Sequence, residues 1–334
     1  MLERLQVPVA MFLFKRKDTT LRIIDRIAEV KPSRIYLIAD AGRNDEERQM
    51  VEDCRRAVEA RISWECEVIK HYAQENRGVY RNIGEGAKWV FEREERAIFL
   101  EDDNLPEVTF FYYCQEMLEK YADHPKVLWI CGTNYLGKYQ PQDGASYMFT
   151  KHLLPCGWAS WGNKFLKYYD GELKTFGEAS KERLVANYEN KALFRYQLQL
   201  IEKTAYKLKH DISRSSWDYQ MAYSVRVNNM YGISPCYNQI KNIGVDEFST
   251  HGGTTLSITM TQRFCGMDSY PLQFPLKHPE KVECDPDYEK IIGKIILPPW
   301  TNRMKIQVGY LIKRLMGIDR DASLKEVLAK RKQK

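Results

Sequence analysis

The chain has 334 residues, of which 44% are hydrophobic and 29% charged, a composition that excludes a disordered protein and permits a large core. The formal net charge of +6 is concentrated near the C-terminus, where residues 297–334 carry ten basic and three acidic side chains. The rest of the chain is close to neutral, so we expect no binding to nucleic acid.

The compartment is predicted from the N-terminus and the cysteines. Acidic Glu3 precedes an apolar run that ends in basic residues, the reverse of a secretory signal, and no stretch approaches the ~20 apolar residues of a spanning helix. The eight cysteines form no CxxC pair, which favours reduced thiols over disulfides or a zinc site. We expect a cytoplasmic protein, soluble or peripheral on the inner face of a membrane.

Short apolar runs alternate with helical patterns through the first part of the chain. Strands are predicted at 7–14, 34–42, 66–72, 96–102 and 126–137, with helices at 18–32, 44–62, 82–92 and from Pro106 to Tyr121. This alternation indicates the α/β class, with a mostly parallel sheet covered by helices. Ligands bind beyond the carboxyl ends of the strands in such sheets, so the residues that follow each strand are the first candidates for a site.

Three adjacent carboxylates, Glu101, Asp102 and Asp103, follow an apolar strand in "AIFLEDDNLPE". Hard divalent cations such as Mg²⁺ and Mn²⁺ take oxygen ligands, often one or two carboxylates together with phosphate and water. Acids also favour helix N-termini, so a solvated turn that caps the following helix explains the same residues. The triplet alone leaves both interpretations open.

A polar, glycine-containing loop lies upstream of the acids and opens a helix. Its polar and glycine residues are Asn76, Gly78, Arg81, Asn82 and Gly84. Free N–H groups at a helix N-terminus favour anions, and the strand after this helix delivers the acids to the same edge of the sheet. Loop, helix and acid-ended strand together predict a cradle for a nucleoside diphosphate.

These motifs carry a resemblance to a known family. The pattern ENxG, RNxG and an acid-ended strand resembles the nucleotide-sugar half of GT-A glycosyltransferases. More narrowly, roughly the first 280 residues resemble a bacterial group of sugar transferases, or HlpA-like proteins, akin to animal N-acetylglucosaminyltransferase I. The matching segments, in order, are "FKRKDTT", "IADAG", "FLEDDNLP", "GWASWGNKF", "WDYQ", "NIGVDEFSTHGG" and "FPLKHP".

The resemblance implies a GT-A (Rossmann-like) fold and roles for individual residues. Residues 1–130 would form the nucleotide-sugar half of one domain, 131–280 its acceptor half, and 281–334 a basic C-terminal extension. Asp40 would contact the nucleobase, Arg16 the phosphates, and Asp103 the metal, while Glu101 and Asp102 contact sugar or ribose. Arg81 and Asn82 would belong to the donor site. The acids depart from the common DxD form, which leaves the division of roles among them open.

Further candidates lie in the second part of the chain. From its residues alone, Asp218 in "SSWDYQMAY" is more typical of a helix cap, whereas the resemblance makes it the base that deprotonates an acceptor hydroxyl. Trp158 and Trp161 either line the donor–acceptor cleft or pack the core. His251 either completes the metal and diphosphate site or is structural.

The C-terminal segment "NRMKIQVGYLIKRLMG" has an apolar helical face flanked by basic residues, with Trp300 before it. The face comprises Met304, Val308, Leu311, Ile312 and Leu315. Such a helix either lies on an anionic membrane surface or docks on the domain.

The expected function is a metal-dependent, inverting glycosyltransferase. It would use Mn²⁺ or Mg²⁺, a nucleotide sugar with UDP-sugar as the expected donor, and a glycan or lipid-linked acceptor in surface polysaccharide synthesis. A nucleotidyltransferase that makes nucleotide sugars is an alternative, but it needs a glycine-rich loop after the first strand and "FKRKDTT" has no glycine. The other alternative is a non-catalytic nucleotide- or glycan-binding protein at a membrane.

Overall fold

A computed structural model describes residues 4–210, 217–244 and 265–322. Within these residues, one sheet of eight strands runs through the molecule in the order β3-β2-β1-β4-β8-β6-β9-β7. In chain order, its strands are β1 (Val9–Leu13), β2 (Arg34–Ala39), β3 (Glu67–Tyr72), β4 (Arg96–Glu101), β6 (Val127–Cys131), β7 (Tyr147–Thr150), β8 (Trp158–Trp161) and β9 (Tyr231–Pro235).

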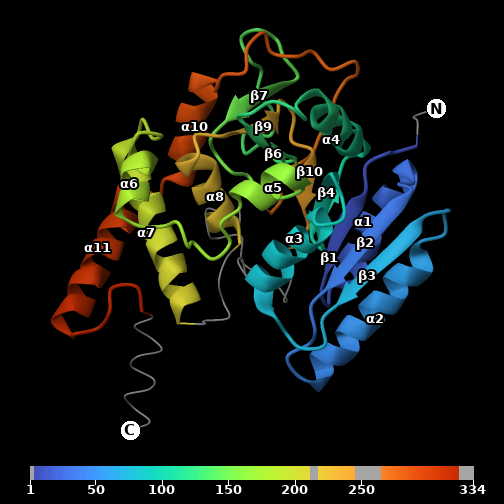
Figure 1. Ribbon diagram of the computed structural model, residues 1–334, viewed down its shortest axis with the longest axis horizontal. Helices are drawn as coiled ribbons and strands as arrows, with labels where there is room; N and C mark the ends of the chain where they lie inside the picture. The colour runs from blue at the N-terminus through green and yellow to red at the C-terminus, as the bar shows by residue number, and fades with distance from the viewer. Residues whose placement is uncertain (1–3, 211–216, 245–264, 323–334) are drawn as a thin grey trace.

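Helices cover the sheet. Those of the first half are α1 (Lys17–Val30), α2 (Asp45–Arg61), the π-helix η1 (Tyr80–Glu85), α3 (Gly86–Phe91) and α4 (Val108–Lys120). Those of the second half are α5 (Gly162–Tyr168), α6 (Glu178–Val185), α7 (Lys191–Lys209), α8 (Asp218–Val227), α10 (Pro286–Ile296) and α11 (Trp300–Leu315). Helices α6, α7 and α11 lie on the opposite side of the molecule from α2 (Figure 1). The predicted α/β class, with helices covering the sheet and following it at the C-terminus, is confirmed.

The first four strands in the chain are parallel and adjacent. β1 pairs with β2 on one side and β4 on the other, and β2 pairs with β3. All five residues of β1 are buried, as expected for a central parallel strand that is covered on both faces. Because the strands are parallel, the segments after β1, β2 and β4 all leave at one edge of the sheet.

The second half of the chain extends the same sheet. β8 lies between β4 and β6 and runs antiparallel to both, whereas β9 runs parallel to β6. β7 closes the sheet as an antiparallel partner of β9. The sheet therefore joins residues before and after position 130 through the hydrogen bonds of β8.

A small second sheet lies beside the end of β4. It consists of β5 (Asn104–Pro106) paired antiparallel with β10 (Ile240–Asn242). The predicted helix start at Pro106 is wrong, because this pairing keeps Pro106 extended and α4 begins at Val108. The pairing brings residues 240–244 next to the three acids.

Two further findings concern cysteines and membranes. All eight cysteines have free thiols. In the part of the chain that the structure describes, no helix combines the length and the apolar character needed to cross a membrane.

Candidate functional site

The three acids lie where β4 ends and turns into β5. Glu101 is the last residue of β4, and the turn of Asp102 and Asp103 leads to β5. Arg16, which follows β1, contacts two of them: its Nη1 lies 3.1 Å from Oδ2 of Asp103 and 3.5 Å from Oδ1 of Asp102. The parallel pairing of β1 with β4 causes this meeting, since both segments leave the sheet at the same edge.

Asp218, the first residue of α8, lies close to the same acids although it is more than a hundred residues away in the sequence. Burial raises the pKa of Glu101 well above its ordinary range, and the charges of Asp103, Asp102 and Asp218 raise it further, against a smaller opposing effect of Arg16. We call Glu101, Asp102, Asp103 and Asp218 the acid cluster.

Asp218 has largely apolar and aromatic surroundings. Trp217 before it is 4% exposed, and the pKa of buried Tyr135 is raised by burial and also by the nearby charge of Asp218. The hydroxyl of Tyr169 donates to the carbonyl of Trp217 at 3.4 Å. Burial raises the pKa of Tyr169, and the charge of Asp218 is among those that raise it further. Half-buried Asp218 therefore lies beside aromatic side chains as well as beside the other acids.

Buried Asn104 fixes the orientation of Asp103. Its Nδ2 donates to Oδ1 of Asp103 at 2.5 Å, and its Oδ1 accepts from the backbone N–H of Gly157 at 2.8 Å. The backbone N–H of Ile243 donates to the carbonyl of Asp103 at 2.9 Å. Sequence reasoning missed Asn104, although a polar residue directly after an acid triplet, at the start of a buried segment, is a usable signal.

Gly244 lies against Asp103 and Arg16. A Cβ at this glycine would lie 2.4 Å from Oδ2 of Asp103 and 3.0 Å from Nη1 of Arg16. Only a residue without a side chain fits here while Arg16 and Asp103 keep their positions. Sequence reasoning did not single out this glycine, because the contact depends on the pairing of β5 with β10.

Asp40, which follows β2, binds a loop of the protein itself. Its two carboxylate oxygens accept hydrogen bonds from the N–H groups of Ala41, Arg77 and Gly78 and from Nδ2 of Asn76, at 2.7–3.1 Å. These four donors occupy the acceptor positions of a carboxylate. Asp40 is 6% exposed and holds the loop before η1 against the end of β2, and its contact with a nucleobase stays a prediction.

The same bonds engage part of the predicted phosphate cradle, which stays a prediction. The N–H groups of Arg77 and Gly78, at the start of the helical segment, donate to Asp40. The anion at this helix N-terminus is thus a side chain of the protein itself. Arg81 and Asn82, which were also predicted for the donor site, lie in η1, where Arg81 is exposed and Asn82 is 8% exposed.

Trp158 and Trp161 belong to the core, which corrects the expectation that they line a cleft. They are 1% and 4% exposed, because β8 lies in the middle of the sheet. Trp158 stacks between Phe99 and Trp129, with ring centroids 4.0 and 4.2 Å away. Core packing, the alternative interpretation, describes both tryptophans.

The acid cluster offers the kind of donor atoms that a hard divalent cation takes. Carboxylate oxygens are the ligands of Mg²⁺ and Mn²⁺, and one or two of them suffice where nucleotide phosphates supply others. Among residues 4–210, 217–244 and 265–322, no three carboxylate, imidazole or thiol groups converge as ligands of one ion. His251, the other predicted ligand, lies outside the described residues.

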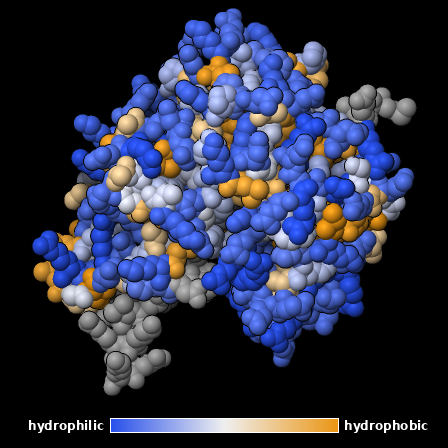
Figure 2. Space-filling model, viewed as in Figure 1, coloured by the Kyte–Doolittle hydropathy of each residue, from blue (hydrophilic) through white to orange (hydrophobic). Residues whose placement is uncertain are grey.

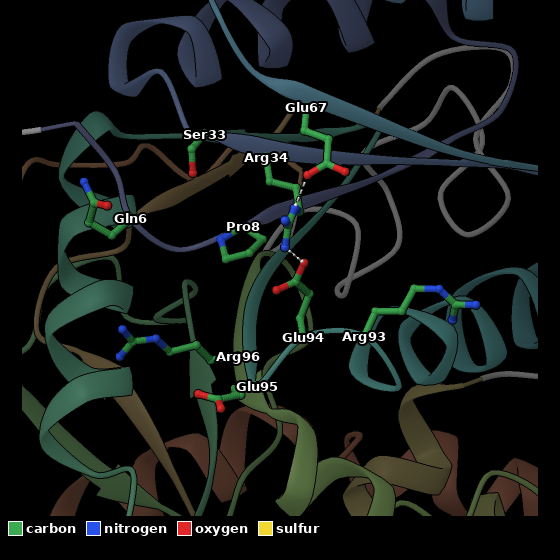
Figure 3. Close-up of a pocket in the computed structure, with 9 residues that line it drawn as sticks. All are labelled: Gln6, Pro8, Ser33, Arg34, Glu67, Arg93, Glu94, Glu95 and Arg96. Atoms are coloured by element: carbon green, nitrogen blue, oxygen red, sulfur yellow. Dashed lines mark hydrogen bonds and ion pairs between the residues drawn. The ribbon is translucent and has the colours of Figure 1, made fainter.

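A polar cavity of about 390 Å³ lies at the opposite edge of the sheet, where the parallel strands begin. Arg34 lies between two acids there, with Nε 2.7 Å from Glu67 and Nη1 2.6 Å from Glu94 (Figure 3). The hydroxyl of Tyr36 also donates to Glu94 at 2.6 Å. Arg34, Glu67 and Glu94 are thus paired with one another, which is typical of a structural network.

No family model and no curated protein matches this chain. Solved structures with a similar arrangement include glucosyl-3-phosphoglycerate synthase from Mycobacterium tuberculosis in complex with Mn²⁺, UDP and glucosyl-3-phosphoglycerate, at 9% identity and a TM-score of 0.29. That match covers 47% of this chain and 57% of the synthase, so it spans little more than half of that protein.

Two other similar structures are those of a pyrophosphorylase and a synthase. UDP-glucose pyrophosphorylase complexed with UDP-glucose is 9% identical over 70% of this chain and 91% of that chain, with a TM-score of 0.34. The 4-diphosphocytidyl-2C-methyl-D-erythritol synthase from Anaerococcus prevotii is 13% identical over 56% and 86%, with a TM-score of 0.30. These likenesses are too distant to give this chain a family or an activity.

Proposed function

We propose that this protein is a metal-dependent, inverting glycosyltransferase that moves a sugar from a nucleotide sugar, with UDP-sugar as the expected donor, to an acceptor hydroxyl of a glycan or glycoconjugate. One observation carries the proposal: the fold brings Asp218 beside the three acids that end β4, so that its charge raises the pKa of Glu101. The three acids, which would bind a cation, and Asp218, which would act as a separate base, would thus lie at the same edge of the sheet.

The acids and Arg16 would bind the leaving diphosphate. Asp103, with Asp102 beside it, would hold Mn²⁺ or Mg²⁺, which when bound neutralises the charge that develops on the diphosphate. Arg16 contacts both acids, and its guanidinium would pair with the phosphate oxygens of the donor. Asn104 and Gly244 keep Asp103 and Arg16 in place.

Asp218 would act as the base. The acceptor oxygen attacks the anomeric carbon and forms the new glycosidic bond as the bond to the diphosphate breaks. The acceptor proton passes to the carboxylate of Asp218, and the diphosphate leaves with the bonding electrons. One displacement of this kind inverts the configuration of the anomeric carbon and needs no covalent enzyme intermediate.

The loop after β1 argues against a nucleotidyltransferase. Such an enzyme needs room and free N–H groups for a triphosphate. In this chain Lys15 pairs with Glu47 at 2.9 Å and Arg16 pairs with the acids, in a segment without glycine. The two reactions are distinguished by their products, since only nucleotidyl transfer releases or consumes pyrophosphate.

The test begins with binding. Purified protein is heated with each of several UDP-sugars, with and without Mn²⁺, and a ligand of the folded state raises the unfolding temperature. Turnover is then measured as release of UDP in the presence of monosaccharide and lipid-linked acceptors. Release of pyrophosphate from UTP and a sugar phosphate would favour the nucleotidyltransferase instead.

The variant Asp218→Asn separates binding from chemistry. We expect donor affinity within about twofold of the parent and a loss of transfer of about 10²–10⁴-fold, the usual contribution of a general base. Asp45→Asn is the matched control, because Asp45 also lies in the first turn of a helix but is exposed and pairs with Arg48. Loss of donor affinity in Asp218→Asn, or full transfer, would contradict the assigned base.

A further inference from the structure

Helix α11 carries its apolar residues on the side that faces away from the protein. Its exposed apolar side chains follow each other at spacings of four, four, three and four residues, which places them on one side of an α-helix. They are Trp300, Met304, Val308, Leu311 and Leu315, with exposed fractions of 68, 53, 50, 56 and 79%, and Ile312 beside them at 42%. We call these six residues the α11 stripe.

The opposite side of α11, which is more polar, faces the protein. Arg303, Ile306, Tyr310 and Lys313 are half-buried, and no residue of the helix is fully buried. The segment after the helix fixes this orientation, since Arg320 pairs with Glu202 of α7 at 3.1 Å and lies over the ring of Tyr310 at 4.7 Å. An amphipathic helix that only docked on the domain would present the reverse face.

Exposed apolar surface is concentrated on this helix. In the part of the chain that the structure describes, eleven large hydrophobic side chains are exposed, and six of them form the α11 stripe. The other five are scattered over separate elements. Figure 2 shows hydrophobic side chains gathered at the lower left, where Figure 1 places α11. A contiguous patch of this kind marks an interaction surface.

Positive charge borders the stripe. Exposed Lys305 and Arg314 lie on its two sides, and residues 297–334 have a net charge of +7 in a chain whose remainder is close to neutral. Trp300 lies at the start of the helix, and tryptophan favours the boundary between lipid and water. Apolar residues on one face and basic residues along its margins are the composition of a helix that lies in the surface of an anionic membrane.

We propose that α11 binds the surface of a membrane that contains anionic phospholipid, with the α11 stripe among the acyl chains and the basic margin at the headgroups. This goes beyond sugar transfer and does not depend on it. The helix would lie in the membrane surface and hold the protein there without crossing the bilayer.

The full-length protein is sedimented with vesicles of phosphatidylcholine alone and of phosphatidylcholine mixed with phosphatidylglycerol. We expect binding to the mixed vesicles that weakens as salt is added. The double variant Met304→Ser/Leu311→Ser lowers the partition coefficient by about tenfold or more, because two apolar side chains no longer enter the membrane. Lys305→Gln/Arg314→Gln lowers binding to the mixed vesicles and makes it less sensitive to salt.

A matched control removes apolar side chains elsewhere. Leu166→Ser/Val185→Ser changes two exposed residues of α5 and α6, and we expect the partition coefficient of the parent. Thermal unfolding followed by circular dichroism verifies that each variant is folded. Equal partition of the parent and Met304→Ser/Leu311→Ser, or no binding to mixed vesicles, overturns the proposal. So does sedimentation velocity that shows a dimer lost in the same variant, because a second copy would then cover the stripe.

Discussion

The charged residues at the two edges of the parallel sheet are arranged differently. Where the strands begin, Arg34 lies between Glu67 and Glu94, and the contacts with Glu94 and Glu67 raise the pKa of Arg34. Where the strands end, Arg16 contacts Asp102 and Asp103, and burial together with the charges of Asp103, Asp102 and Asp218 raises the pKa of Glu101. At the first edge, acids surround an arginine and balance its charge, whereas at the second edge several carboxylates raise the pKa of their neighbour Glu101.

This difference shows which charged groups are structural. Balanced pairs hold the chain together and need no ligand, whereas like charges in one place cost free energy unless something else interacts with them. The acid cluster is therefore a better candidate for the reactive site than the 390 Å³ cavity at the other edge.

The largest effect is expected at the acid cluster itself. Asp103→Ala removes the carboxylate nearest to Arg16, and we expect turnover to fall by about 10³-fold or more, the scale of lost charge stabilisation in a transition state. Glu67→Ala, at the other edge, removes one partner of Arg34 and is the control. The prediction is measured as UDP release per enzyme at saturating UDP-sugar and Mn²⁺. Equal losses in both variants would remove the distinction between the two edges.

A moderate effect is expected at Gly244, where a substitution tests how tightly this residue packs against Asp103 and Arg16. The Cβ of Gly244→Ala would overlap Asp103 and Arg16, so both must shift, and we expect turnover to fall by about 10–100-fold with the unfolding temperature little changed. Gly309→Ala is the control, because its Cβ meets nothing within 4 Å. Parent-like turnover in Gly244→Ala would show that the contact between Arg16 and Asp103 is not needed.

The smallest effect concerns stability in a buried region with balanced charge. Burial lowers the pKa of His152 to about 4, the nearby charge of Glu289 opposes this, and that of Arg226 adds to it. Between pH 6.5 and 4 the unfolded chain therefore binds a proton that the folded chain does not. The free energy of unfolding should fall by about 2 kcal/mol between pH 7 and pH 5 from this group alone.

Urea unfolding at the two pH values measures this loss. In His152→Gln the decrease between pH 7 and pH 5 should be smaller than in the parent by about the same 2 kcal/mol. His210→Gln, at an exposed position, is the control and should keep the decrease of the parent. An unchanged pH dependence in His152→Gln would mean that His152 is protonated equally well in the folded chain.

The sequence predicts the class of this fold well because its signals are local. The apolar runs that become β1, β2, β3 and β4 lie between helical patterns, and that alternation alone specifies a parallel sheet and the edge at which the acids end. The short strand β8 gives no such signal, since "WASW" has four residues and is buried throughout. Trp158 and Trp161 were therefore open to two interpretations.

The details of the site depend on contacts between distant segments. Pro106 starts a helix by its local pattern, but pairing with β10 places it in β5. Asp40 follows a strand in the expected place. However, it accepts hydrogen bonds from N–H groups in the loop after β3, which no local pattern indicates. The proximity of Asp218 to Glu101 likewise depends on the whole sheet, and only the resemblance indicated a role for Asp218.

The position of β8 has a consequence for the order in which contacts form during folding. β8 joins β4 to β6, while residues that meet at the acid cluster come from the segments after β1 and β4, from the start of α8 and from the end of β10. These contacts span more than two hundred residues, so they form late compared with local helices. A chain still emerging from the ribosome lacks Asp218 and Gly244, and donor binding would thus report completed folding.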